Sequence, residues 1–323
     1  MANVPTQKQK LRNSIFIAMI TVARPVHWVK NLSLFAAILL SGLLFEKGMF
    51  AAVVWGFIAF NLITSAAYII NDVLDAKLDR LHPIKKYRPI ASGALPVWLA
   101  MIEAIVLATT SLVLSASLNS IFFLIVFGYL VIQILYSLGL KKVPTLDILI
   151  IASGFIMRIY AGAFVINAHL SVWFLLCVIS VALFLASGKR RAELNILRIG
   201  SGVTRESLMK YKRELLNSYV TMFGNAAWMS WSLFTFFESP KASLPLWLLL
   251  AELSKTTTID KLLMLTIPVV IYGIMRYESL IFEGESEAPE KVLLTDGALL
   301  FAIFLWLVIV FWVIYSGAST AGI

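Results

Sequence analysis

Long runs of apolar residues, separated by short polar and charged segments, make up most of this chain. An α-helix rises about 1.5 Å per residue, so about 20 apolar residues can cross the hydrocarbon core of a bilayer, which is about 30 Å thick. The apolar stretches predict an all-α, polytopic membrane protein with nine transmembrane helices. Their ranges are 31–46, 50–71, 97–117, 119–140, 146–167, 170–188, 214–237, 258–281 and 296–316.

The N-terminal segment differs from these spans. Residues 1–14 are polar and basic, and the apolar run 15–23 that follows is too short to span a bilayer. Arg24 and Pro25 come next without a clean small-residue cleavage site, so we expect an interfacial helix and not a cleaved signal peptide. The predicted organisation is an N-terminal segment 1–30, one transmembrane catalytic domain 31–316 and a short tail 317–323.

Composition agrees with a membrane protein and excludes several other classes. With 60% hydrophobic residues and a mean hydropathy of +0.89, the 323-residue chain is too apolar for a soluble domain. The single cysteine, Cys177, excludes a disulfide framework, and three scattered histidines give no support to a zinc site. The net charge of +9 comes from short loops with no continuous basic face, so no nucleic-acid partner is expected. Oligomeric state stays open.

Lys and Arg residues indicate how the helices are oriented. They concentrate in the N-terminal segment and in the connections after the second, fourth, sixth and eighth predicted helices. Cytoplasmic loops of membrane proteins carry such an excess. This predicts a cytoplasmic N-terminus and a C-terminus on the other side. The opposite connections carry only Lys47, Lys241, Lys255 and Lys261.

The segment 71–96 holds the strongest chemical signal. If the second helix runs through Asp79, then Asp72, Asp75 and Asp79 share one helical face. Three neighbouring carboxylates repel one another unless a cation lies between them, and Mg²⁺ takes one or two carboxylates together with substrate phosphates. Four basic residues follow that could meet the remaining phosphate charge. They are Arg80, Lys85, Lys86 and Arg88. The alternative is an ordinary cytoplasmic loop of solvated charges.

Two charges belong to the fifth predicted helix. Asp147 and Arg158 project from nearly the same face but lie about 16 Å apart along the axis, so they cannot pair with each other. A buried charge in a membrane span is costly, which makes Arg158 a functional candidate with a phosphate as its partner. The alternative is an Arg satisfied by carbonyl groups or by an acid on another helix. Gly154 and Gly162 should allow a neighbouring helix or a ligand to approach closely.

A second charged segment, 187–202, follows the sixth helix. It contains Lys189, Arg190, Arg191 and Glu193, on the same predicted side as the Asp-rich segment. Cations at a helix C-terminus are favoured by the helix dipole and by orientation in the membrane alone. The shared side favours a further role, in which the two segments form two walls of one cavity.

These segments together resemble a known family. The N-D-x-x-D-x-x-x-D pattern at 71–79, followed by RPIASG, resembles the UbiA superfamily of intramembrane prenyltransferases. The segments RPVHWVKN, HPIKKYRPIASG, LDILIIASGFIMRIYAGA, SGKRRAEL and PEKVLLTD, which extend from residue 24 to 296, are similar to its decaprenyl-phosphate phosphoribosyltransferase branch. Typical members carry a second acidic motif where this chain reads GKRRAEL. The cations there suggest a donor richer in phosphate than a prenyl diphosphate.

The resemblance implies Mg²⁺-dependent transfer of a 5-phosphoribosyl group from phosphoribosyl pyrophosphate to a polyprenyl phosphate, in a bacterial inner membrane, for cell-envelope biosynthesis. It implies that Asp72, Asp75 and Asp79 hold the metal and that these aspartates and Arg158 are catalytic. Further residues are expected to bind the substrates. They are Lys30, Asn71, Lys85, Arg88, Tyr136, Lys141, Asp147, Lys189, Arg190, Arg191 and Glu193.

Two other functions stay open. One is a prenyltransferase that uses a prenyl diphosphate donor and an aromatic acceptor with the same first motif and Mg²⁺. The other is a transporter of an anionic lipid or a sugar phosphate. Charges at the bilayer centre and broken helices are typical of transport, whereas most charges here are expected at one membrane face.

Overall fold

The computed structural model describes residues 7–82, 85–197, 210–238, 259–283 and 295–315. Every regular element within these ranges is a helix, which confirms the all-α prediction. The predicted tail 317–323 and most of PEKVLLTD lie outside the described ranges. The elements are α1 (Gln7–Ala23), η1 (Pro25–Leu34), α2 (Phe35–Leu40), α3 (Met49–Asp79), η2 (Lys85–Tyr87), α4 (Val97–Leu118), α5 (Ser120–Leu138), η3 (Leu140–Lys142), α6 (Leu146–Val165), α7 (Val172–Leu197), α9 (Arg213–Phe237), η4 (Ile259–Thr266), α11 (Ile267–Glu283) and α13 (Gly297–Tyr315).

Seven of the described helical segments are long and apolar enough to cross a membrane. They correspond to the second to sixth, the eighth and the ninth predicted spans, and they make the chain a multi-pass membrane protein. Their ranges are Met49–Asp79, Val97–Leu118, Ser120–Leu138, Leu146–Val165, Val172–Asn195, Lys261–Glu283 and Gly297–Tyr315. The described residues therefore do not confirm the count of nine.

The first predicted span, 31–46, is wrong as a single helix. The ten-residue 3₁₀ helix η1 covers its beginning, and the six-residue helix α2 then ends at Leu40. Residues 41–46 form turns and a bend, so no single α-helix covers the predicted range. The sequence contributes to this break: Asn31 is fully buried and bonded to Asn61 of α3, and Gly42 has a φ of 76°.

The seventh predicted span, 214–237, is a helix but is not among the seven. α9 has 25 residues, which is enough length to cross a bilayer. It also carries polar residues along its first half, including Glu214, Asn217 and Asn225, and these lower its hydropathy. α9 is therefore long enough to cross a bilayer but less apolar than the seven candidate spans.

The second predicted helix extends further than its apolar run. α3 continues past residue 71 to Asp79, so the three aspartates do lie on one continuous helix, as the prediction of a shared face required. The polar last turns are held by contacts with other elements, described below. Pro83 follows in the sequence and disfavours helical conformation in the residue before it.

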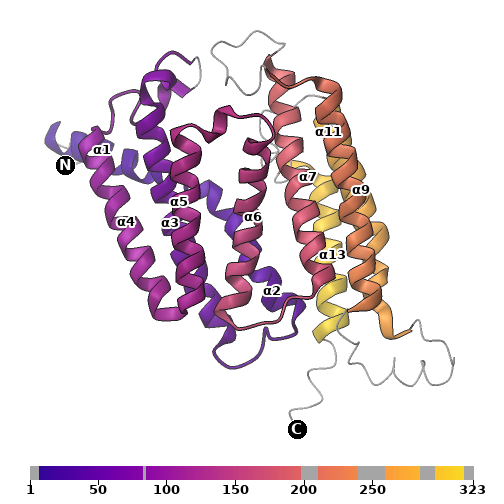
Figure 1. Ribbon diagram of the computed structural model, residues 1–323. Coiled ribbons are helices and arrows are strands. Elements are labelled where there is room, and N and C mark those ends of the chain that lie inside the picture. Colours follow the sequence, from indigo (N-terminus) through magenta and orange to yellow (C-terminus); the bar gives the residue numbers. More distant parts are fainter. Residues whose placement is uncertain (1–6, 83–84, 198–209, 239–258, 284–294, 316–323) are drawn as a thin grey trace, which may run out of the picture.

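The polar connections gather at one end of the bundle. The upper end of the molecule in Figure 1 holds the last residues of α3, α5 and α7 and the first residues of α6. Helix α1 lies at this end as well. The connections from α4 to α5 and from α6 to α7 lie at the opposite end. α1 is a helix that packs through Ala18 and Val22 against Ile69 and Ala76 of α3. Its interfacial position in a membrane stays a prediction.

Small residues bring the broken N-terminal segment close to the bundle. A Cβ atom on Gly162 of α6 would lie 2.0 Å from the carbonyl oxygen of Leu34, the last residue of η1. Only glycine leaves room for this backbone approach, which confirms the expected role of Gly162. Gly154 differs, because the nearest atom to its Cβ position belongs to the Arg158 side chain.

Candidate functional site

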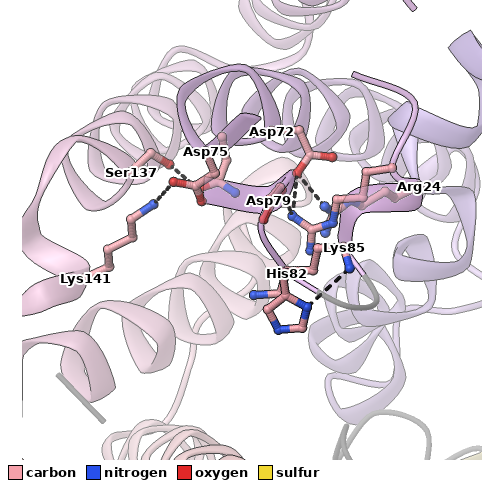
Figure 2. Close-up of polar contacts among 10 residues, drawn as sticks. Arg24, Asp72, Asp75, Asp79, His82, Lys85, Ser137 and Lys141 are labelled. Atoms are coloured by element: carbon pink, nitrogen blue, oxygen red, sulfur yellow. Dashed lines mark hydrogen bonds and ion pairs between the residues drawn. The ribbon is translucent and has the colours of Figure 1, made fainter. Parts of the chain in front are cut away.

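The three aspartates of α3, hereafter the α3 carboxylate group, each contact a cation (Figure 2). Asp72 accepts hydrogen bonds from Arg24 Nη2 at 2.5 Å and from Arg88 Nη1 at 3.1 Å. Arg88 Nη1 also donates to Asp79 at 2.7 Å, so one guanidinium bridges two carboxylates. Asp75 accepts from Lys141 Nζ at 2.5 Å. Mutual repulsion of the carboxylates is thereby offset by three cations.

The three cations come from three different connections. Arg24 lies between α1 and η1 with a left-handed backbone (φ 54°, ψ 59°), and its guanidinium also lies 5.0 Å from the ring of Tyr68. Arg88 follows η2, and Lys141 belongs to η3. The aspartates share one face of α3 because of helical periodicity, whereas the cations meet them only through tertiary packing.

The donor types in this group suit a hard divalent cation, but the arrangement does not form a ready metal cluster. Carboxylate oxygens and the amide oxygen of the neighbouring Asn71 are the ligands that Mg²⁺ prefers. Among the described residues, no three His, Cys, Asp or Glu side chains converge to hold a metal ion. Asn71 Oδ1 instead accepts a hydrogen bond from Ser137 of α5 at 2.9 Å. The predicted metal-binding role of the aspartates stays a prediction.

Arg190 is the centre of a second group of polar residues, hereafter the Arg190 group. Its side chain is 0% exposed. The Nε atom lies 2.6 Å from Asp147 Oδ2, Nη1 donates to Glu193 at 2.5 Å, and Nη2 donates to the hydroxyl of Tyr136 at 2.8 Å. The ends of α5, α6 and α7 therefore meet on one guanidinium. Four predicted substrate-binding residues come together here.

The two groups are neighbours along α5. Tyr136 contacts Arg190, whereas the next residue, Ser137, contacts Asn71 beside the α3 carboxylate group. Lys141, which pairs with Asp75, follows on η3, and Asp147 lies in the first turn of α6. The end of α5 and the η3 connection thus link both groups, as the prediction of a shared side required.

Arg191 faces a different direction from Arg190. Its guanidinium bonds to Asn217 of α9 at 2.5 Å and to Asn195, and it lies 5.5 Å from the ring of Phe282 in α11. Asn195 in turn donates to the carbonyl oxygen of Ile281 at 3.1 Å. Arg191 thus joins α7 to α9 and α11 and lies apart from the Arg190 group. These contacts favour a packing role for a residue predicted to bind substrate.

Arg158 lies deeper in the bundle and is only 5% exposed. Its Nε donates to Asn31 at 2.5 Å, Nη1 to the carbonyl oxygen of Gly154 at 2.7 Å, and Nη2 to the hydroxyl of Tyr129 at 2.9 Å. The ring of Phe60 lies 5.7 Å from its Cζ. No carboxylate pairs with Arg158 in the described part of the chain, so its charge is compensated by neutral groups and aromatic rings alone.

The remaining predicted residues are Lys30, Lys85 and Lys189. Lys30 is half-buried in η1, and Lys189 is half-buried next to Arg190 in α7. Lys85 begins η2, and its backbone N–H donates to His82 Nδ1 at 3.3 Å (Figure 2). Their positions are compatible with the predicted binding roles and do not test them.

Several site residues escaped the sequence analysis. Arg24 belongs to the segment RPVHWVKN but was not among the predicted site residues, and nothing in the sequence around it indicates a partner in α3. Tyr129 lies inside an apolar run of α5, where helical periodicity cannot distinguish it from packing residues. Tyr211 precedes α9 and bonds to Asp147 at 2.6 Å. Their common property is that each contacts a residue far away in the sequence.

The fold and the polar groups define a multi-pass helical membrane protein with two linked groups of paired charges at one end of its bundle. The chain belongs to the UbiA prenyltransferase family, whose family model matches residues 31–200. It is 35% identical over 293 residues to the decaprenyl-phosphate phosphoribosyltransferase of Mycolicibacterium smegmatis, covering 90% of each chain. It is 32% identical over 314 residues to the enzyme of that name from Corynebacterium glutamicum, covering 96% of this chain and 90% of the relative.

Solved structures agree on the fold. A UbiA homologue from Archaeoglobus fulgidus, solved bound to GPP and Mg²⁺, superimposes with a TM-score of 0.68 over 92% of this chain and 99% of that chain, at 18% identity. The same homologue bound to DMAPP and Mg²⁺ gives a TM-score of 0.67 at 18% identity, over 92% of this chain and 98% of that chain. The predicted UbiA-type bundle is confirmed by this likeness.

Proposed function

We propose that this protein transfers the 5-phosphoribosyl group of phosphoribosyl pyrophosphate to a polyprenyl phosphate lipid and releases pyrophosphate. The observation that carries the proposal is the buried Arg190 group beside the α3 carboxylate group. A donor with a diphosphate at one end and a 5-phosphate at the other needs two anion sites, and two neighbouring polar groups supply them. The relatives named decaprenyl-phosphate phosphoribosyltransferase support the same reaction.

The α3 carboxylate group and Asn71 are proposed to hold Mg²⁺. Their hard oxygen ligands fit that ion, and the donor diphosphate would complete its coordination. Bound there, the metal would neutralise charge on the leaving pyrophosphate. In the structure Arg88 pairs with Asp72 and Asp79, and Lys141 pairs with Asp75. Both cations are therefore close enough to contact a phosphate bound beside these carboxylates. We expect them to shift from carboxylate to phosphate when the donor binds.

Arg190 is proposed to bind the 5-phosphate of the donor. Its guanidinium is already oriented by Asp147, Glu193 and Tyr136, and a preorganised planar fork loses little freedom when it binds a phosphate. Lys189 is the adjacent cation proposed to assist. Arg191 is left out of this role, because its guanidinium bonds to Asn217 of α9 and lies over the ring of Phe282 in α11.

Arg158 is proposed to bind the phosphate of the lipid acceptor. It lies away from the α3 carboxylate group, among aromatic rings and amides, and has neutral partners where a buried cation ordinarily has an anion. A lipid whose chain lies in the bilayer could bring its phosphate to this position. The end of the bundle that carries both polar groups is proposed to face the cytoplasm, as the distribution of Lys and Arg predicts.

The proposed transfer needs no general base. An oxygen of the lipid phosphate forms a bond to C1 of the ribose, while the bond from C1 to the pyrophosphate oxygen breaks and pyrophosphate leaves with the electron pair. The acceptor is already an anion, so no proton has to be removed. What the chain supplies is orientation of two anionic substrates and stabilisation of the charge that shifts to the leaving group.

A direct assay separates this proposal from the alternatives. Purified protein with Mg²⁺ receives either labelled phosphoribosyl pyrophosphate with polyprenyl phosphate, or labelled prenyl diphosphate with an aromatic acceptor. We expect a labelled lipid of the mass of a phosphoribosyl polyprenyl phosphate in the first reaction only. Product in the second reaction alone identifies a prenyltransferase, a function that the GPP-bound structural neighbour favours. No product and no pyrophosphate release in either reaction would favour transport.

A further inference from the structure

The backbone is strained at Thr145, the residue that precedes α6. Thr145 has a φ of 67° and a ψ of −47°, and Leu146 N–H donates to the carbonyl oxygen of Pro144 at 2.8 Å. These values describe a classic γ-turn, which is rare, and a β-branched residue at positive φ is an outlier. Such a conformation persists only where the surroundings hold it in place, and it is often found at functional sites.

Tyr211 holds this turn. Its hydroxyl accepts a hydrogen bond from the Thr145 backbone N–H and donates one to Asp147 Oδ1 at 2.6 Å. The side chain is only 6% exposed, and its ring packs in a cluster that includes Ile148 of α6 and Leu216 of α9. Burial, followed by the hydrogen bond to Asp147, raises the pKa of Tyr211, so the phenol stays protonated and able to donate.

Asp147 connects Tyr211 to the Arg190 group. One carboxylate oxygen accepts from Tyr211, and the other lies 2.6 Å from Arg190 Nε. Asp147 and Arg190 are both fully buried, so their relative orientation is set by these contacts and not by water. Removing the hydroxyl would leave Oδ1 and the Thr145 N–H each without this partner, and a buried polar group without a partner is costly.

We propose that Tyr211 is a positioning residue, which orients Asp147 and through it the guanidinium of Arg190 for the 5-phosphate of the donor. This inference rests on the proposed function. It assigns a role to a residue outside the α3 carboxylate group and outside the Arg-rich end of α7. This role explains the strained turn at Thr145. The turn directs the Thr145 N–H and the Asp147 carboxylate to the same Tyr211 hydroxyl.

The test compares Tyr211→Phe with Tyr219→Phe in the purified full-length protein. Tyr219 packs against the same apolar cluster, so its variant controls for loss of a tyrosine hydroxyl in this region. For Tyr211→Phe we expect the KM for phosphoribosyl pyrophosphate to rise about tenfold, the scale of one lost hydrogen bond to a charged group, while kcat and the KM for polyprenyl phosphate change little. For Tyr219→Phe we expect wild-type constants.

A double-mutant cycle with Asp147→Asn separates positioning from general stability. Because Tyr211 acts through Asp147, the Tyr211→Phe change should add little to the KM of an Asp147→Asn variant. An unchanged donor KM in Tyr211→Phe, full additivity in the cycle, or failure of Tyr211→Phe to fold would each overturn the inference. Failure of the proposed function is distinguishable, since the wild-type protein would then form no labelled lipid from this donor.

Discussion

The α3 carboxylate group and the Arg190 group are built in opposite ways. In the first, three carboxylates come from one helix and receive cations from three separate connections. In the second, one fully buried cation receives its partners from the ends of three helices. Under the proposed function, the first group would exchange its cations for a metal ion and a phosphate, whereas the second is oriented by its own contacts before a ligand binds. A site for a donor with two anionic ends can use both properties.

The largest effect is expected at the α3 carboxylate group. Asp75→Asn keeps the shape of the side chain but removes a negative charge, and we expect turnover to fall by about a thousandfold or more, because metal-bound charge stabilisation contributes several kcal/mol. The measurement is the initial rate with saturating substrates and a Mg²⁺ titration. Glu46→Gln, at an exposed carboxylate in the connection from α2 to α3, is the matched control. A normal rate in Asp75→Asn would remove Asp75 from the metal site.

The comparison is sharpened by Arg190 and Arg191, which are adjacent in the chain and face different helices. Arg190→Lys keeps the charge but loses the planar fork, and we expect the donor KM to rise by about one hundredfold, roughly 3 kcal/mol. Arg191→Lys should leave the donor KM nearly unchanged and lower the melting temperature. Steady-state kinetics and thermal melts of both variants check this. Equal effects of the two variants on the donor KM would show that both arginines act together.

Arg158→Lys should affect the other substrate. Lysine cannot reproduce the three directed hydrogen bonds to Asn31, Gly154 and Tyr129, so the cation is less well placed for the acceptor phosphate. We expect the KM for polyprenyl phosphate to rise by about tenfold, with the donor KM nearly constant. Varying one substrate at a time provides the measurement. A change in the donor KM alone would assign Arg158 to the donor.

The smallest effect is expected at an ion pair that belongs to neither group. Asp296 accepts from Arg276 at 2.8 Å and from the Leu299 N–H at 2.9 Å at the start of α13, and the hydrogen bond from Arg276 holds the pKa of Asp296 below its ordinary value. Its stabilisation is therefore present at neutral pH and is lost as pH falls through that lowered pKa. Asp296→Asn should lower the melting temperature slightly at pH 7, and this difference should vanish in strong acid. Activity at pH 7 should not change.

The predictability of the site depended on how local each contact is. The shared face of Asp72, Asp75 and Asp79 follows from helical periodicity, and α3 extends far enough to make it real. Different directions for Arg190 and Arg191 follow from the same periodicity, because adjacent residues of an α-helix project about 100° apart, but their partners do not. Asn31 shows most clearly what the sequence could not predict. The apolar run around it predicted a spanning helix, but Asn31 lies in the 3₁₀ helix η1 and forms a buried hydrogen bond with Asn61 of α3.

By itself the sequence determined that the chain crosses a membrane several times, that its charges gather in alternate connections, and that three aspartates share one face. Hydropathy and periodicity are properties of neighbouring residues, so they can be read along the chain. Only the tertiary structure decided that Arg24 meets Asp72, that Arg190 joins three helix ends, and that Tyr211 contacts Asp147. These pairs are decided by how distant helices pack, because a buried charge takes whichever partner the packing brings within reach.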